Sequence, residues 1–140
     1  VGSQSVVVVL DIKYEGFMKK PKIKMLNGKE TFDQDLFLFI KKIEEYGAGE
    51  IIINCIDKDG MKNGYDIKLI SKLRDATKLI LTLVGGASGY NDIENLVKSV
   101  KNVGCSAGSL FVFKGKFDAV LINYLNKHDK EKLDSISFHE

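Results

Sequence analysis

The residue best suited to acid–base chemistry in this sequence is Asp11, which ends the apolar run Val6–Leu10. A carboxylate at the mouth of an apolar site is costly to desolvate, and this suits it to general acid–base work. The alternative is a structural role, in which Asp11 caps a loop amide or pairs with Lys13. The residue types alone leave both roles of Asp11 open.

Small residues mark the ends of two later apolar runs. Gly85 and Gly86 follow one run, and Gly108 and Ser109 follow the next. Glycines at such positions let backbone amides approach a phosphate, often with help from a helix N-terminus. One glycine pair would also fit a simple turn. Two small-residue ends in successive units favour a phosphate site.

The segment from Asn54 to Asp66 is dense in Asp and Gly, and it includes Asp59 and Gly60. Calcium is a poor interpretation, because the ligand spacing and the closing Glu of an EF-hand loop are both missing. We expect Asp66 to cap a helix. Gly60 and Gly64 are typical of positions where the backbone turns or approaches a ligand closely.

Composition excludes several classes of protein. The chain has 21 Lys+Arg against 19 Asp+Glu, so nothing global favours nucleic acid or an anionic membrane as a partner. No apolar run reaches the roughly 18 to 20 residues of a membrane helix, and we see no signal peptide. Cys55 and Cys105 lie in apolar runs without a CxxC pair or His cluster, which predicts reduced core thiols. We therefore expect a soluble, cytoplasmic protein with no metal and no cofactor.

Alternating strands and helices must position the candidate residues. Four apolar runs rich in Val and Ile are typical of parallel strands buried on both faces. The segments between them have helical periodicity, although the last of these is weaker. The predicted strands are Val6–Leu10, Ile51–Ile56, Leu79–Val84 and Cys105–Phe113, and the predicted helices are Asp35–Tyr46, Asp66–Ala76, Asp92–Lys101 and Phe117–Leu125.

Four strand–helix units favour an α/β fold that is half of a (β/α)8 barrel, the TIM-barrel architecture. We expect this half-barrel over residues 1–126, followed by a polar, frayed C-terminal tail over 127–140. The Asn27-Gly28 pair predicts a β-hairpin insertion within Phe17–Glu30, after the first strand. A flavodoxin-like open sheet with a ligand at its switch point would also explain the glycines.

Several strings resemble the second half of the cyclase subunit family of imidazole glycerol phosphate synthase. They are Gly47–Ile52, Asn54–Asp66, Gly85–Ala87 and Ala107–Phe111. The string Ile-Asp-x-Asp-Gly-x-x-x-Gly-Tyr-Asp at 56–66 is rarely met elsewhere, and the resemblance runs over about residues 5–125. That family has a barrel made of two fused half-barrels, each holding one phosphate of the substrate. The present chain resembles units five to eight.

The resemblance implies roles for individual residues. Asp11 matches the family's acid–base aspartate on strand five. Asn54 occupies a position where the family usually has a hydroxyl residue that faces the substrate. Glu50 matches an acid in the charged gate through which ammonia enters from a glutaminase subunit, although an exposed Glu at a strand start is an equally open interpretation. The implied phosphate and substrate site also contains Asp59, Gly60, Gly85, Gly86, Gly108 and Ser109.

The implied activity is lyase/cyclase chemistry of histidine biosynthesis, on a phosphorylated small molecule with ammonia from a glutamine amidotransferase partner. The segment from Ser109 to Tyr124 is more similar to paralogues in bacterial surface-sugar operons, which implies a part in making acetamidino sugars. The family's other catalytic aspartate lies on strand one, outside this chain, so we expect no complete reaction from the chain alone. The alternative is a phosphate-binding half-barrel that forms a homodimer through its strand edges.

Overall fold

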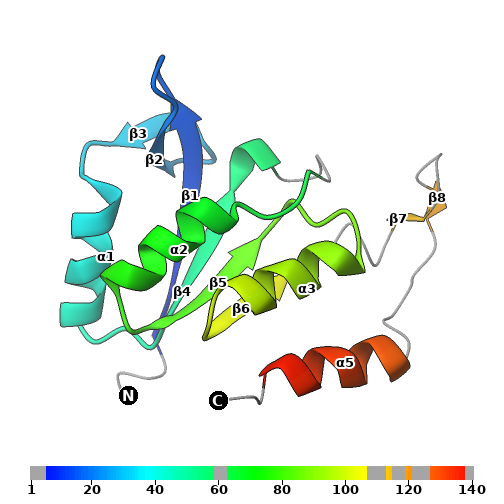
Figure 1. The fold of residues 1–140 in the computed structure, drawn as a ribbon. Helices are drawn as coiled ribbons and strands as arrows, with labels where there is room; N and C mark the ends of the chain where they lie inside the picture. Colours follow the sequence, from blue (N-terminus) through cyan, green and yellow to red (C-terminus); the bar gives the residue numbers. More distant parts are fainter. Residues whose placement is uncertain (1–5, 59–62, 107–112, 115–118, 121–126, 138–140) are drawn as a thin grey trace.

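The computed structural model describes residues 6–58, 63–106, 113–114, 119–120 and 127–137. Its main element is a six-stranded sheet in the order β3-β2-β1-β4-β5-β6 (Figure 1). Strands β1, β4, β5 and β6 run parallel, and β2 and β3 add an antiparallel edge. The strands are β1 (Val7–Glu15), β2 (Lys20–Met25), β3 (Glu30–Phe32), β4 (Glu50–Cys55), β5 (Ile80–Val84) and β6 (Val103–Ser106).

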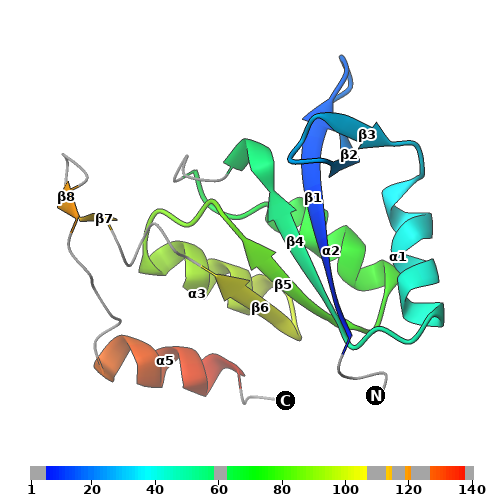
Figure 2. The same ribbon diagram turned by 180° about the vertical axis from the view of Figure 1, so that it is seen from behind.

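Helices α1 (Leu36–Glu45), α2 (Ile67–Ala76) and α3 (Tyr90–Ser99) lie on one face of this sheet, as the front and back views show (Figures 1 and 2). Two of them begin at an Asp that caps the first turn. Asp35 accepts hydrogen bonds from the amides of Phe37 and Leu38 at 3.0 and 3.1 Å, and Asp66 accepts one from Leu69 at 3.0 Å. The predicted capping role of Asp66 is confirmed.

The core lies between the sheet and these helices. Side chains alternate along each strand, so every second residue faces the helices. These residues are almost fully buried, whereas on the opposite face Val9 remains 60% exposed and Ile80 55% exposed. The prediction of strands buried on both faces is therefore wrong for this chain by itself. The buried strand residues are Leu10, Ile12, Ile51, Ile53, Cys55, Leu81 and Leu83.

The sheet and its one-sided helices match the predicted half-barrel. Three predicted strands and three predicted helices are confirmed, with boundaries shifted by a few residues. The hairpin is also confirmed, with Asn27 and Gly28 both at positive φ in its turn. It does not stand apart from the sheet, however, because β2 pairs with β1 from Asp11 to Glu15. This pairing extends β1 five residues beyond the predicted run.

Two predictions near the C-terminus are wrong. Ala119–Val120, within the predicted helix Phe117–Leu125, forms strand β8 and pairs with β7 (Phe113–Lys114). The remainder of that predicted helix, and residues 107–112 of the predicted last strand, lie outside the described residues. In the predicted frayed tail, Lys127–Ser137 forms helix α5.

Helix α5 packs against α3 through polar contacts (Figure 1). The Lys132 ammonium lies 2.8 Å from a carboxylate oxygen of Glu94 and over the ring of Tyr90. Tyr90 also donates a hydrogen bond to the carbonyl of Asp129 at 3.2 Å. A polar segment can therefore be a helix here because charged contacts add to the packing of a single apolar residue, Leu133, against the core. None of the described helices is long and apolar enough to cross a membrane.

Candidate active site at the carboxyl ends of the strands

The centre of the candidate site is a contact between two neighbouring parallel strands. The register pairs Asp11 of β1 with Asn54 of β4. The Asn54 side-chain amide donates a hydrogen bond to Asp11 Oδ1 at 2.8 Å. Among the described residues, no ion pair joins Asp11 to Lys13. The Lys13 pairing of the structural alternative is therefore not seen in this part of the chain, and the roles of Asp11 stay predictions.

Asn54 also carries an acceptor that nothing described satisfies. Its Oδ1 is buried and has no hydrogen-bond partner in the described part of the chain. A carboxylate only accepts hydrogen bonds, so the Asn54 NH2 group must face Asp11, and the amide oxygen must point elsewhere. An unsatisfied buried acceptor costs about 1–3 kcal/mol. A ligand N–H or O–H group, or a water, would offset this cost beside Asp11.

A groove opens next to Asp11 along the edge of β1. It has a volume of about 310 Å³, and apolar side chains dominate its lining. Lys24 also lines it and lies opposite Asp11 across the β1–β2 pair. The Lys24 ammonium is held by Glu15 Oε1 at 2.8 Å and Thr31 Oγ1 at 2.7 Å. This cation therefore fixes the hairpin to β1 rather than pairing with Asp11.

The loop after β4 is tied to the loop after β5 by a close backbone contact. The amide of Gly64 donates to the carbonyl of Gly86 at 2.8 Å. Gly86 has a φ of +103°, and a Cβ at this position would lie 2.7 Å from the Gly64 carbonyl oxygen. Residue 86 must therefore be glycine for the two loops to meet.

Tyr65 ties the loop after β4 to the end of β6. Its buried hydroxyl donates to the backbone carbonyl of Ser106 at 3.0 Å. Burial, with the neighbouring Cys105, raises the pKa of Tyr65 far above its ordinary value, so the hydroxyl stays a donor. Together with the Gly64–Gly86 contact, this bond brings the carboxyl ends of β4, β5 and β6 to one place.

The loop that begins with Gly85 and Gly86 leads directly into α3. Ser88 donates its amide and its hydroxyl to Asp92 Oδ2 at 2.7 and 2.6 Å. Burial raises the pKa of Asp92, but the hydrogen bonds from Ser88 and the Gly89 backbone outweigh it and leave the pKa below its usual value. Asp92 is therefore ionised, and its carboxylate accepts the hydrogen bond that the Ser88 amide could otherwise donate to a ligand. On this loop, the predicted hydrogen-bond donors to a phosphate are the amides of Gly85 and Gly86.

The structure brings together Asp11, Asn54, Gly85 and Gly86 at the carboxyl ends of the strands. Glu50 lies at the opposite, amino end of β4, as predicted from its place in the run. The other predicted site residues lie outside the described residues, so their positions stay predictions. They are Asp59, Gly60, Gly108 and Ser109.

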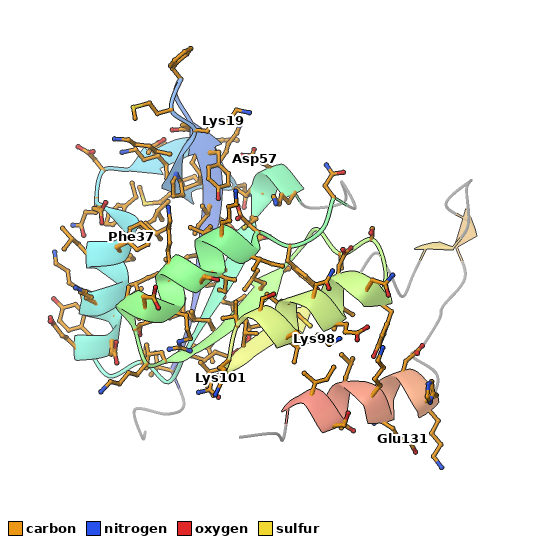
Figure 3. All side chains as sticks on the ribbon, viewed as in Figure 1. Lys19, Phe37, Asp57, Lys98, Lys101 and Glu131 are labelled. Carbon is orange, nitrogen blue, oxygen red and sulfur yellow. The ribbon has the colours of Figure 1, made fainter. Side chains whose placement is uncertain are left out.

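Lys58 was not singled out by the sequence analysis. Its Cβ lies 3.5 Å from the point that a Cβ on Gly86 would occupy, so the residue borders the glycine loop. Its place between two aspartates in the 56–66 string was the available signal. The flanking Asp57 has a structural role, since it accepts a hydrogen bond from the Tyr14 amide at 2.7 Å. Figure 3 labels it near the carboxyl end of β1.

The described residues contain no group of three or more potential metal ligands. Both cysteines are free thiols. Cys55 is buried, and this burial, with the nearby Asp66 carboxylate, raises its pKa to about 11. The thiol is therefore protonated and unreactive near neutral pH.

Parallel strand–helix units with an acid and glycine loops at the carboxyl ends define a protein of the (β/α)8-barrel class. The family model described as "Histidine biosynthesis protein" matches residues 1–118. The chain belongs to this family and is of the type of the imidazole glycerol phosphate synthase subunit HisF.

Relatives from several bacteria share this half of the fold. A provisionally named imidazole glycerol phosphate synthase subunit of Vibrio vulnificus is 48% identical, covering 94% of this chain and 51% of the relative. Another provisionally named subunit, from Leptospira borgpetersenii, is 44% identical over 95% of this chain and 52% of the relative. The subunit HisF of Pseudoalteromonas translucida is 32% identical over 79% of this chain and 44% of the relative. The chain spans about half the length of these curated relatives.

Proposed function

We propose that the chain is the C-terminal half of an ammonia-using cyclase subunit, which works with a glutaminase partner on a phosphorylated small molecule. The contact between Asn54 and Asp11 at 2.8 Å carries this proposal, because it joins the candidate proton-transfer group to a second polar residue at the strand ends. The Gly64–Gly86 contact supports it, since it brings a candidate phosphate loop to the same edge.

In the proposed reaction, the glutaminase releases ammonia, which enters the barrel at the amino end, near Glu50. The glycine loops hold the phosphate of the substrate at the carboxyl end. Asp11 then exchanges protons with the substrate. In the histidine version of the reaction, a C–N bond breaks and the imidazole ring closes. A second carboxylate, supplied by the other half of the barrel, completes the acid–base pair. Positioning by the phosphate matters because it holds the reacting atoms against Asp11.

Within the family, we propose that the chain serves sugar amidination in surface-glycan synthesis. Sequence identity sets the chain apart from the matched relatives that are named HisF without qualification. Four provisionally named subunits are 36–48% identical to the chain, whereas the relatives named HisF without qualification are 32–34% identical. A paralogue with a changed substrate also fits Asn54, which replaces the family's usual hydroxyl residue.

Two parallel assays test this function on the whole protein with its glutaminase. One supplies the ribulosyl aminoimidazole bisphosphate of the histidine pathway, and the other supplies an N-acetyl sugar with the sugar amidotransferase. We expect glutamine-dependent formation of the acetamidino sugar. Turnover of the histidine substrate alone would move the chain to the other branch, and the absence of both products would refute the proposed function.

A second candidate function is a self-associating, phosphate-binding half-barrel. The open inner face favours it, since Val9 and Ile80 are more than half exposed there. The edge of β1 from Val7 to Leu10 also lies beyond the β1–β2 pairing. An open strand edge with apolar side chains favours association. Size-exclusion chromatography of this 140-residue chain separates the cases, since a stable monomer would argue against self-association.

Replacing Asn54 tests its part in the proposed site. Asn54→Leu removes the hydrogen bond to Asp11 and the spare acceptor. Because a hydrogen bond to a charged group contributes about 1.5–3 kcal/mol, we expect turnover by the whole protein to fall roughly ten- to a hundredfold. Asn54→Thr restores a hydroxyl and should recover most of the rate in steady-state assays. Full activity of Asn54→Leu would remove Asn54 from the site.

A further inference from the structure

The amino end of the inner sheet face holds a second polar pair, away from Asp11. Thr82 of β5 donates its hydroxyl hydrogen to Glu50 Oε1 of β4 at 2.6 Å, and the bond is partly buried. In the strand register, Glu50 pairs with Ile80, so Thr82 lies two residues further toward the carboxyl end. The Glu50 side chain is therefore drawn along the inner face of the sheet, into the half-barrel.

The neighbouring strand leaves room for this hydroxyl. Thr82 pairs with Gly104 of β6 in the parallel register. A Cβ on Gly104 would lie 2.5 Å from Thr82 Oγ1, which is too short for any real contact. A side chain at residue 104 would displace the hydroxyl from Glu50. Three adjacent strands thus contribute to one arrangement, in which Glu50 is the only charged member.

We propose that Thr82 is a positioning residue for Glu50 and holds the Glu50 carboxylate at the amino end of the barrel, where the proposed function has ammonia enter. A threonine hydroxyl has one hydrogen to donate, and Thr82 gives it to Glu50. What remains toward the barrel is acceptor capacity alone, from the carboxylate and the hydroxyl oxygen. Such a pair can accept hydrogen bonds from a small molecule that carries N–H donors.

Apolar side chains border the pair on the inner face. Ile52 separates Glu50 from Asn54 along β4, and Ile80 lies beside Glu50 on β5. The inner face of β4 is therefore polar at both ends and apolar in the middle. Neutral ammonia is small enough to pass such an apolar layer. Ammonium would have to lose its hydration there, and this desolvation costs a large free energy. This inference rests on the proposed function, and it adds Thr82, which the sequence resemblance did not implicate.

The test compares two nitrogen sources in the whole protein with its glutaminase. Thr82→Val keeps the shape of the side chain and removes the hydroxyl. We expect glutamine-dependent turnover to fall about ten- to a hundredfold, as for the loss of one hydrogen bond to a charged group. Turnover with saturating ammonium chloride should be unchanged, because that ammonia reaches the strand ends from solution. Thr82→Ser keeps the hydroxyl and should keep the wild-type ratio of the two rates.

A matched control exists outside the barrel interior. Thr77 donates its hydroxyl to Glu44 Oε2, also at 2.6 Å, next to the C-terminal end of α2. Thr77→Val should therefore leave the ratio unchanged. If Thr82→Val fails to fold, Thr82→Ala serves in its place. A wild-type ratio in the folded Thr82 variant would overturn this inference alone, whereas a wild-type protein that uses neither nitrogen source would overturn the proposed function.

Discussion

Replacing Asp11 with Asn is expected to reduce turnover by the whole protein by about 10²- to 10⁴-fold, the usual contribution of a general acid–base group. Asn has nearly the same shape as Asp, but it cannot exchange a proton with the substrate. The amide of Asn54 can still donate to the new side-chain oxygen, so the contact between β1 and β4 should persist. Steady-state rates, with circular dichroism as the check on folding, measure the effect.

The control for this variant is Asp75→Asn. Asp75 is exposed on α2, away from the carboxyl ends of the strands, and carries the same change in charge. It should leave the rate within a factor of two or so, since exposed charges contribute little. If Asp11→Asn is as active as Asp75→Asn, Asp11 is not the proton-transfer group.

Gly86→Ala is expected to damage stability and phosphate binding together. The backbone at residue 86 has a φ of +103°, and the added Cβ would meet the Gly64 carbonyl oxygen at 2.7 Å. We expect the free energy of unfolding to fall by about 1–3 kcal/mol, the usual cost of a strained backbone position. The loops after β4 and β5 must also separate, so inorganic phosphate should bind at least tenfold more weakly, a loss of about 1.4 kcal/mol.

The neighbouring Gly89 provides the comparison for Gly86. It has an extended φ of −168°, and no atom lies within 4 Å of the place where its Cβ would be. Gly89→Ala should therefore bind phosphate like the wild type, with little change in stability. Urea denaturation and calorimetric titration with inorganic phosphate measure both quantities. Equal losses in the two variants would show that the Gly64–Gly86 contact has no special role.

Periodicity predicted most of the fold because the inner and outer faces of the elements differ. The helices α1, α2 and α3 each place their buried side chains at three- and four-residue steps, as Leu36, Ile40 and Ile43 do. The runs that became β4 and β5 were mostly apolar, and each was interrupted by one polar residue, Asn54 or Thr82. The two-residue Asn-Gly turn was a local signal of its own.

The missed elements depend on contacts between distant residues. The second half of β1 contains Lys13 and Glu15, and no apolar run marks it as a strand. It is one because β2 pairs with it. Helix α5 has few apolar residues, and its place is set by Lys132 on Glu94 and Tyr90 of α3. Charge partners at this separation do not show in a local pattern.

The candidate site was partly predictable. The neighbouring positions of Asp11 and Asn54 follow from two parallel strands that each end at a polar residue. The bond from Tyr65 to the Ser106 carbonyl and the bond from Thr82 to Glu50 could not be predicted, because each joins a side chain to a partner that is distant in the sequence. Spacing along the chain predicts where the strands end. Which partner a side chain can reach depends on the register between strands, which spacing does not give.

The most direct test of the account follows nitrogen through the whole protein and its glutaminase. Glutamine labelled with ¹⁵N in its side-chain amide is supplied with the phosphorylated substrate, and the product is analysed by mass spectrometry. The account predicts one ¹⁵N atom in each product molecule of the wild type and essentially no product from Asp11→Asn. Labelled product from Asp11→Asn at the wild-type rate, or unlabelled product from the wild type, would contradict it.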